Sequence, residues 1–319
     1  MHWKLKSKIQ NAIALLPSSA SYSAYYQLQR RFGGLRRVNP LRKLAAGIET
    51  GKLIKEQDFE LDHKTFLEIG TGRLTLVPLA YWLMGAKKTI TIDLNPYLKK
   101  ELIAESLEYI VNNEAEIRDL FGSLLNQQRF DDLLVFAKTA SFSTRAFLDL
   151  CQINYLAPSN AADTKLPPQS IDFHTSYTVF EHIPRDTLKQ ILEEGNRIIS
   201  NNGLFIHKVD YSDHFSHSDP NISAINFLQY SDDQWDKYAG NRYMYMNRLR
   251  HDDFIDLFES VKHDIVEAQT SISERAQQLL QNNEIQLDQQ FQTKSKETLS
   301  IGSSWIISRK KRNCLKINF

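Results

Sequence analysis

The sequence predicts an α/β protein with a doubly wound, mostly parallel sheet of seven strands and helices on both faces. From Lys64 onward, short apolar runs rich in β-branched residues alternate with longer runs whose apolar residues recur at helical spacing. Such alternation indicates parallel strands joined by crossover helices. The 319 residues can bury a sizeable core, and 42% apolar and 24% charged residues are typical of a globular protein.

The elements can be placed from short stretches of sequence. Five strands are predicted at TFLEI, TITIDL, QINYLA, SIDFHTSY and GLFIHKVDY. DFIDLFESVKHDIVEAQ adds a helix and a sixth strand, and ETLSIGSSWIISRKK contains the last strand. Between the first two strands, LTLVPLAYWLMGA is predicted to be a helix, with Pro78 in its first turn and Gly85 at its end. Pro184 starts a later helix, which NNG at 201–203 should end.

The chain divides into a basic helical N-terminal extension, residues 1–60, and an α/β domain, residues 61–319. Two insertions interrupt the minimal α/β repeat, at about 113–150 and about 211–250. Because long connections in compact domains are commonly functional, we expect both insertions to cap a ligand site.

Charge is unevenly distributed, although the net charge is only +1. Residues 1–50 carry nine Lys or Arg and one acid, so the net charge is +8 for this segment and −7 for the rest of the chain. Such a segment suits contact with an anionic membrane, a nucleic acid or an acidic substrate. It equally suits a helical extension that docks on the acidic side of its own domain.

Cysteine usage and hydropathy favour a cytoplasmic protein without export. Cys151 and Cys314 match neither a disulfide framework nor a metal-ligand spacing. The N-terminal apolar run AIALLP is too short for a membrane span or a signal-peptide core.

A glycine turn in FLEIGTGRLTLVP follows the first strand. Gly70 and Gly72 begin a dinucleotide fingerprint, but Thr75 stands where its third glycine belongs. Asp93 ends the second strand, where an acid can accept both ribose hydroxyls of either NAD or S-adenosylmethionine. Glu68, at the end of the first strand, is the residue that discriminates between these cofactors.

Three motifs in order, LEIGTG, TIDLNP and SIDFHTSYTVFEHIP, make residues 62–210 resemble the Rossmann-like (class I) S-adenosylmethionine-dependent methyltransferases. The resemblance implies S-adenosylmethionine as cofactor, with the glycine turn at the methionine moiety, Glu68 near its amino-acid end and Asp93 on the ribose. Asp163 would approach the adenine amino group, although it lies one position later than the family's usual acid. The full set of predicted cofactor-binding residues is Glu68, Gly70, Thr71, Gly72, Asp93, Leu94, Asp163 and Tyr177.

Histidines near the ends of the fourth and fifth strands are the candidates for catalysis. A histidine is a natural general base for a hydroxyl acceptor, and an aspartate can orient it. We expect His214 first and His182 second as the base, oriented by Asp210 or Asp213. Asp210, His214 and His217 are also ligand types, but without a recognised spacing no metal is expected.

The acceptor predicted from these residues is a small molecule, a saccharide or a lipid-linked molecule. The motifs that mark nucleobase amino-methylating and protein-arginine enzymes are missing. Two other classes of function remain open at this stage. One is a nucleotide-cofactor (NAD) oxidoreductase, and the other is a non-catalytic adaptor or RNA-binding protein that uses residues 1–50 as a basic arm.

Overall fold

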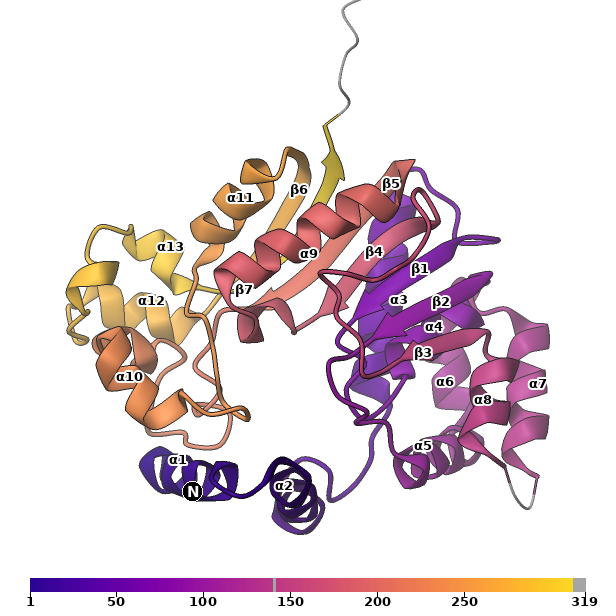
Figure 1. Cartoon of the computed structure of the whole chain (residues 1–319), viewed down its shortest axis with the longest axis horizontal. Helices are drawn as coiled ribbons and strands as arrows, with labels where there is room; N and C mark the ends of the chain where they lie inside the picture. The colour runs from indigo at the N-terminus through magenta and orange to yellow at the C-terminus, as the bar shows by residue number, and fades with distance from the viewer. Residues whose placement is uncertain (140–141, 312–319) are drawn as a thin grey trace, which may run out of the picture. The chain divides into compact units, whose positions relative to one another are not determined.

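A computed structural model describes residues 1–139 and 142–311 and contains one seven-stranded sheet. The strand order is β3-β2-β1-β4-β5-β7-β6 (Figure 1). The strands are β1 (Thr65–Ile69), β2 (Lys88–Ile92), β3 (Ile153–Leu156), β4 (Ile171–Tyr177), β5 (Ile199–Asp210), β6 (His263–Ile272) and β7 (Ile301–Lys310). Strand β1 pairs in parallel with β2 and β4, β2 pairs in parallel with β3, and β6 and β7 are antiparallel. The predicted mostly parallel seven-stranded sheet is confirmed.

Helices occupy the connections between strands and the N-terminal segment. They are α1 (Trp3–Ala14), α2 (Ser18–Phe32), α3 (Leu41–Glu56), α4 (Leu76–Leu83), α5 (Lys100–Asn112), α6 (Glu114–Phe121), α7 (Gln127–Ala137), α8 (Thr144–Leu150), α9 (Arg185–Ile198), α10 (Asp232–Ala239), α11 (His251–Ser260), α12 (Glu274–Gln281) and α13 (Lys296–Ser300). As predicted, α4 holds Pro78 in its first turns, and Gly85 follows its end with a left-handed φ of 105°.

The predicted end of α9 is wrong. The helix ends at Ile198, and Asn201–Gly203, expected to stop it, lie inside β5. Gly203 serves the sheet, because a Cβ there would lie 2.6 Å from the carbonyl oxygen of Asp172 in β4. A glycine that allows two backbones to approach closely has the same sequence signature as a helix stop.

The described residues form two compact units. The β1 unit comprises Arg37–Tyr177 and Gln190–Ile206, and the β7 unit comprises Met1–Arg36, Thr178–Lys189 and residues 207–311. Helix α3 belongs to the β1 unit, where a Cβ at Gly47 would lie 2.5 Å from that of Ala80 in α4. Glycine at position 47 therefore lets α3 and α4 pack closely.

Alternate residues of β4 face opposite sides of the sheet in the β1 unit. On one side, Phe173 contacts Phe66 at 4.9 Å between ring centroids, and Phe66 stacks on Tyr81 of α4 at 4.3 Å. On the other side, His174 packs against Phe205 beneath α9, with ring centroids 4.8 Å apart. Helices therefore cover both faces here, as predicted (Figure 1).

The core of the β7 unit is aromatic and includes the first helix. Trp3 is 3% exposed, and its ring packs near those of Phe215, Trp235 and Tyr238. The Trp3 backbone N–H also donates to Asp219 at 2.8 Å. Helix α1 therefore docks on the chain's own 211–250 insertion, through an aromatic core and the hydrogen bond to Asp219.

Candidate functional site

The turn after β1 is held against the end of β2. Gly70 and Gly72 have φ of 84° and 63°, in the left-handed region that favours glycine. The Gly70 N–H donates to the carbonyl of Ile92 at 2.8 Å. A Cβ on Gly72 would meet no atom within 4 Å, so the turn presents its backbone to open space.

Asp93 lies beside this turn and is fixed by two backbone donors. Its Oδ2 accepts from the Gly72 N–H at 2.8 Å, and its Oδ1 accepts from the Asn95 N–H at 3.0 Å. Burial raises the pKa of Asp93 above its ordinary value, although both hydrogen bonds oppose this shift. The next residue, Leu94, is 67% exposed and offers an apolar surface beside the carboxylate.

Glu68 is buried beneath the turn in a small hydroxyl network. Its side chain accepts from Thr91 Oγ1 at 2.9 Å, and the Thr91 and Thr71 hydroxyls lie 2.5 Å apart. Burial raises the pKa of Glu68 to about 8, although the Thr91 hydrogen bond and the Lys43 ammonium lower it in part. Glu68 is therefore mainly protonated at neutral pH and can donate a hydrogen bond as well as accept one.

Lys43 of α3 is a residue that the sequence analysis assigned only to the basic segment. Its ammonium lies 4.9 Å from the ring centroid of Tyr177, at the end of β4, and acts electrostatically on Glu68. Nothing in the local sequence distinguishes Lys43 from its basic neighbours. Its place beside the predicted cofactor residues Tyr177 and Glu68 follows from the packing of α3 on α4.

The structure does not show Asp163 together with these residues. Its carboxylate is exposed and forms an ion pair with Lys165 at 2.5 Å. The adjacent Thr164 is buried and hydrogen-bonds Glu194 of α9 instead. Contact between Asp163 and an adenine stays a prediction.

A second group of polar side chains lies in the β7 unit, directly after β5. Asp210 Oδ1 accepts from the Ser212 hydroxyl at 2.6 Å, and Asp210 Oδ2 lies 3.5 Å from His214 Nε2. Burial opposes ionisation of Asp210, but the nearby His214 imidazole and the two hydrogen bonds from Ser212 prevail and lower its pKa to about 2. Asp213 hydrogen-bonds Asn226 and the Phe215 backbone, so its carboxylate is engaged within the loop.

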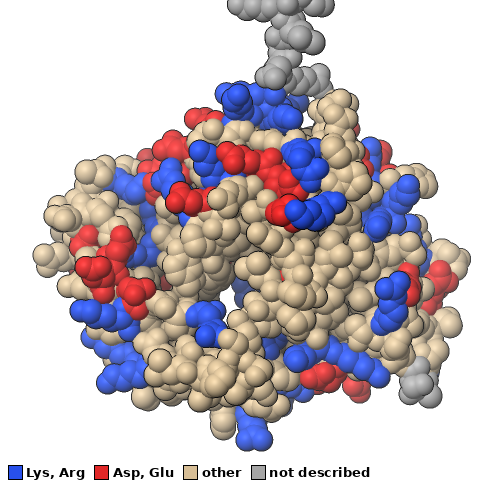
Figure 2. Space-filling view, in the orientation of Figure 1, with Lys and Arg blue, Asp and Glu red and all other residues tan. Residues whose placement is uncertain are grey.

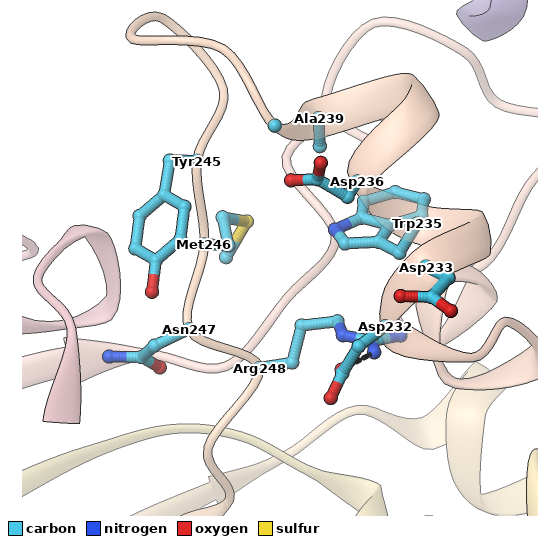
Figure 3. Close-up of a pocket in the computed structure, with 10 residues that line it drawn as sticks. Asp232, Asp233, Trp235, Asp236, Ala239, Tyr245, Met246, Asn247 and Arg248 are labelled. Carbon is cyan, nitrogen blue, oxygen red and sulfur yellow. Dashed lines mark hydrogen bonds and ion pairs between the residues drawn. The ribbon is translucent and has the colours of Figure 1, made fainter.

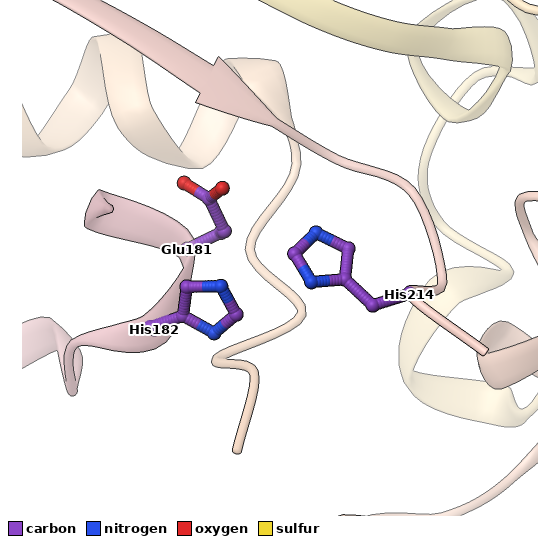
Figure 4. Close-up of side chains that lie close together, drawn as sticks. All are labelled: Glu181, His182 and His214. Carbon is purple, nitrogen blue, oxygen red and sulfur yellow. The ribbon is translucent and has the colours of Figure 1, made fainter. Parts of the chain in front are cut away.

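His182 lies beside His214, with ring centroids 4.8 Å apart (Figure 4). Its Nδ1 is 2.8 Å from the carbonyl of Tyr245, which can only accept, so Nδ1 carries the proton. Burial lowers the pKa of His182 to about 4, and the neighbouring His214 adds to this effect. His182 is therefore neutral at physiological pH, and its Nε2 is an acceptor.

His214 belongs to two groups of side chains whose atoms are of the types that bind metal ions. The ligand atoms of Glu181, His182 and His214 lie within 4.8 Å of one another, and so do those of Asp210, His214 and His217. Glu181 is 2% exposed, and its carboxylate is buried beside the two imidazoles. That no metal binds here stays a prediction.

Comparisons with known proteins give likeness in structure only. The chain matches no protein-family model, and no curated protein matches its sequence significantly. An S-adenosylmethionine-dependent methyltransferase from Mesorhizobium loti is 10% identical, with 81% of this chain and 96% of that chain covered and a TM-score of 0.43. One from Clostridium acetobutylicum is 10% identical, with 91% and 99% covered and a TM-score of 0.45. The [4+2]-cyclase SpnF is 11% identical, with 82% and 81% covered and a TM-score of 0.43.

The sheet itself decides the fold. Its order places β1 centrally, with β2 and β3 on one side and β4 and β5 on the other, and an antiparallel pair at one edge. The chain has a Rossmann-like α/β fold. Among the residues that this Rossmann-like structure describes, no helix is both long enough and apolar enough to cross a membrane.

The protonated state of Glu68 predicts a pH-dependent stability. The pKa of Glu68 is raised to about 8 in the folded chain. Its contribution to the free energy of unfolding is therefore fully present below its ordinary pKa of 4.5 and is lost as the pH rises through about 8. Glu68→Gln keeps a neutral side chain at every pH. We expect its free energy of unfolding to fall less than that of the wild type from about pH 5 to about pH 8, by on the order of a few kcal/mol.

Urea denaturation of both proteins across this pH range measures the difference. Glu108→Gln, on the exposed surface of α5, is the matched control and should follow the wild type. A Glu68→Gln profile parallel to that of the wild type would show that Glu68 is ionised in the folded chain.

Proposed function

We propose that this protein is an S-adenosylmethionine-dependent methyltransferase that methylates a hydroxyl of a small-molecule, saccharide or lipid-linked acceptor. The observation that carries the proposal is the carboxylate of Asp93, held 2.8 Å from the Gly72 N–H beside an open glycine turn. This arrangement puts a carboxylate, which can accept hydrogen bonds from ribose hydroxyls, next to exposed backbone at the carboxyl end of a parallel sheet.

The residues of the β1 unit would hold the cofactor. Asp93 would accept from the ribose hydroxyls, and the backbone of Gly70–Gly72 would lie against the methionine moiety. Leu94 supplies an exposed apolar side chain next to Asp93. When bound, S-adenosylmethionine supplies an activated methyl group, so the protein's task is to align an acceptor and exclude water.

A dinucleotide fits this turn less well. In the dinucleotide fingerprint the third glycine lets helix and strand pack closely. Here the third position is Thr75, whose side chain is 2% exposed and whose Oγ1 has no hydrogen-bond partner among the described residues. The buried Glu68 below the turn also favours S-adenosylmethionine over NAD.

The β7 unit offers the groups that could remove an acceptor proton. Asp210 is ionised and lies 3.5 Å from His214 Nε2, so it can orient that imidazole. His214 is our first candidate for the general base. His182 is the second candidate, because its low pKa makes it a weaker base.

The choice between the two cofactors can be tested directly by measuring ligand binding. We expect S-adenosylhomocysteine to bind in calorimetry and NADH not to bind. Asp93→Ala should weaken S-adenosylhomocysteine binding at least tenfold, about 1.4 kcal/mol, because hydrogen bonds to a charged group are lost. Asp119→Ala, an exposed acid on α6, is the control and should bind like the wild type.

Unchanged affinity in Asp93→Ala would remove this residue from the ribose site, and tight binding of NADH would favour the oxidoreductase. Asp93 also accepts hydrogen bonds from the backbone of Gly72 and Asn95. The thermal unfolding of each variant therefore shows whether weaker binding comes from loss of contacts to the ligand or from loss of the folded structure. Asp163→Ala tests the predicted adenine contact separately.

Turnover should depend on His214 far more than cofactor affinity does. Methyl transfer can be followed with labelled S-adenosylmethionine in extracts of the source cell, which also identifies the molecule that takes the label. We expect His214→Ala to lower the rate of labelling about a hundredfold or more, with S-adenosylhomocysteine affinity unchanged.

The pH profile tests the assignment of His182. His182 is already neutral above about pH 4, so above that pH the activity of His182→Ala should depend on pH as that of the wild type does. Full activity of His214→Ala would exclude it as the base.

We also propose a cytoplasmic protein that contacts anionic membranes through residues 1–50. Leu15 and Leu16, between α1 and α2, and Phe32, at the end of α2, are 88%, 43% and 79% exposed. Exposed Lys8 lies on α1 and exposed Arg31 on α2, and Figure 2 shows basic side chains at the surface beside α2. Apolar and basic side chains together suit the interface of an anionic bilayer.

Co-sedimentation with vesicles tests this contact. The wild type should sediment with vesicles that contain phosphatidylglycerol, and less so at high salt or with neutral vesicles. Leu15→Ser combined with Phe32→Ser should weaken sedimentation severalfold, because about 1.5–3 kcal/mol is available from each fully buried large apolar side chain. Failure of the wild type to sediment would contradict the proposal.

A further inference from the structure

The side chains of Glu181, His182 and His214 lie close together in the β7 unit, although they come from two separate segments (Figure 4). Glu181 and His182 belong to the short helical turn Phe180–His182, and His214 follows β5. We call these three side chains the His–Glu cluster. The sequence predicts no metal here because the spacing of the residues matches no recognised pattern. Spacing along the chain, however, does not show which segments the fold brings together.

His182 is oriented as a metal ligand by the protein itself. Its Nδ1 donates to the carbonyl of Tyr245 at 2.8 Å, so Nε2 carries the lone pair. Histidines that bind metals are commonly fixed in this way, with the second ring nitrogen on a backbone carbonyl or a carboxylate. Figure 4 shows a ring nitrogen of His182 on the edge that faces His214. His182 is also exposed, so an ion can reach the cluster from solvent.

The turn that carries the first two ligands is held by Asn247. The Asn247 N–H donates to the carbonyl of Glu181 at 2.9 Å, and its Nδ2 donates to the carbonyls of Phe180 and Ile183 at 2.8 Å each. Asn247 and Tyr245 lie on the segment that Figure 3 shows across a pocket from α10. One segment therefore fixes both the backbone beneath two ligands and the ring of one imidazole. Such preorganisation is what a specific metal site requires.

The charges in and beside the cluster favour a cation. Glu181 is 2% exposed, and a carboxylate removed from water is stable as an anion only beside positive charge or hydrogen-bond donors. The Asp210 carboxylate adds negative charge, with its Oδ2 3.5 Å from His214 Nε2. That nitrogen is shielded from solvent and makes no hydrogen bond within the described part of the chain. A metal ion would supply positive charge to both carboxylates, and Asp210 would orient the imidazole.

We propose that the His–Glu cluster binds one divalent transition-metal ion of the Zn²⁺ type, through a nitrogen of each imidazole and a carboxylate oxygen of Glu181. Two imidazoles and one carboxylate are a suitable ligand set for zinc, whereas Mg²⁺ and Ca²⁺ prefer oxygen ligands. Zinc ligands lie about 2.0–2.2 Å from the ion, so two of them are roughly 3.4 Å apart in a tetrahedral site. The ligand atoms of the cluster lie within 4.8 Å of one another, and small side-chain rotations would close these separations.

This metal site goes beyond the proposed methyltransferase activity and does not depend on it. A proton and a metal ion compete for an imidazole, so His214 would act as the general base only in the metal-free chain. If His214 is that base, zinc should lower the rate of methyl transfer, and a chelator should restore it. Labelling that is unchanged at full zinc occupancy would contradict the base assignment alone, whereas absence of zinc binding would contradict the metal site alone.

Calorimetric titration of the full-length, chelator-treated protein with Zn²⁺ tests the site. We expect one Zn²⁺ to bind per chain, and Mg²⁺ at the same concentration not to bind. His182→Ala combined with His214→Ala should weaken zinc binding about a hundredfold or more, and Glu181→Gln about tenfold, because ligands are lost. No binding by the wild type, or unchanged affinity in the double variant, would overturn the proposal.

Two exposed histidines outside the cluster provide the matched control. His2→Asn combined with His63→Asn should leave zinc binding unchanged. Asparagine suits both positions, because His2 caps α1 and His63 has a left-handed φ of 63°. Equal weakening in both double variants would show adventitious binding to surface histidines and overturn the site.

Cobalt gives a test that requires no variant. Co²⁺ held by four or five nitrogen and oxygen ligands absorbs visible light much more strongly than the hydrated ion. One equivalent should produce such a spectrum with the wild type, and one equivalent of Zn²⁺ should abolish it. A spectrum of hydrated Co²⁺ alone would overturn the proposal, even if the variants failed to fold.

Discussion

The hydrogen bond from the Gly72 N–H to the carboxylate of Asp93 is the contact on which the arrangement of the β1 unit's site depends. It exists because β1 and β2 are parallel and in a register that pairs Glu68 with Thr91 and Ile69 with Ile92. Both strands then end at the same edge, and the left-handed glycines turn the chain back across the end of β2. The same register puts the Thr91 hydroxyl on Glu68. A shift by one residue would separate all of these groups.

The buried carboxyl group of Glu68 and the partly buried one of Asp210 show how nearby hydrogen-bond donors determine the charge of an acidic side chain. Burial opposes the ionisation of both Glu68 and Asp210, yet the pKa is about 8 for Glu68 and about 2 for Asp210. Glu68 has one hydroxyl donor, whereas Asp210 has the Ser212 hydroxyl, the Ser212 N–H and an imidazole 3.5 Å away. The first site therefore holds a neutral acid, and the second holds an anion beside a histidine. These states suit a polar ligand contact and the orientation of a base, respectively.

The sequence predicted the elements whose signals are local, and missed those that depend on packing. Strand β1, the glycine turn and Asp93 lie within short motifs, because apolar runs and glycines determine them directly. Gly203 was misassigned, because the closeness of β4 that requires a glycine there is not local information. Lys43 was missed for a similar reason, since it reaches Tyr177 only through the packing of α3. His182 and His214 were predicted individually, but the Tyr245 carbonyl that sets the tautomer of His182 comes from a segment 63 residues away.

The first helix has a structural role in the β7 unit that its basic composition conceals. The Trp3 ring lies 6.0 Å from that of Trp235, and the Trp3 N–H is bound by Asp219 in the same insertion. Trp235 and Tyr245 both line the pocket between α10 and residues 245–248, and the carbonyl of Tyr245 lies 2.8 Å from His182 Nδ1. Because interior side chains are closely packed, a change in α1 is transmitted to the position of Trp235. Helix α1 is therefore part of the core of the β7 unit and supports the 211–250 insertion on which Trp235 and Tyr245 lie.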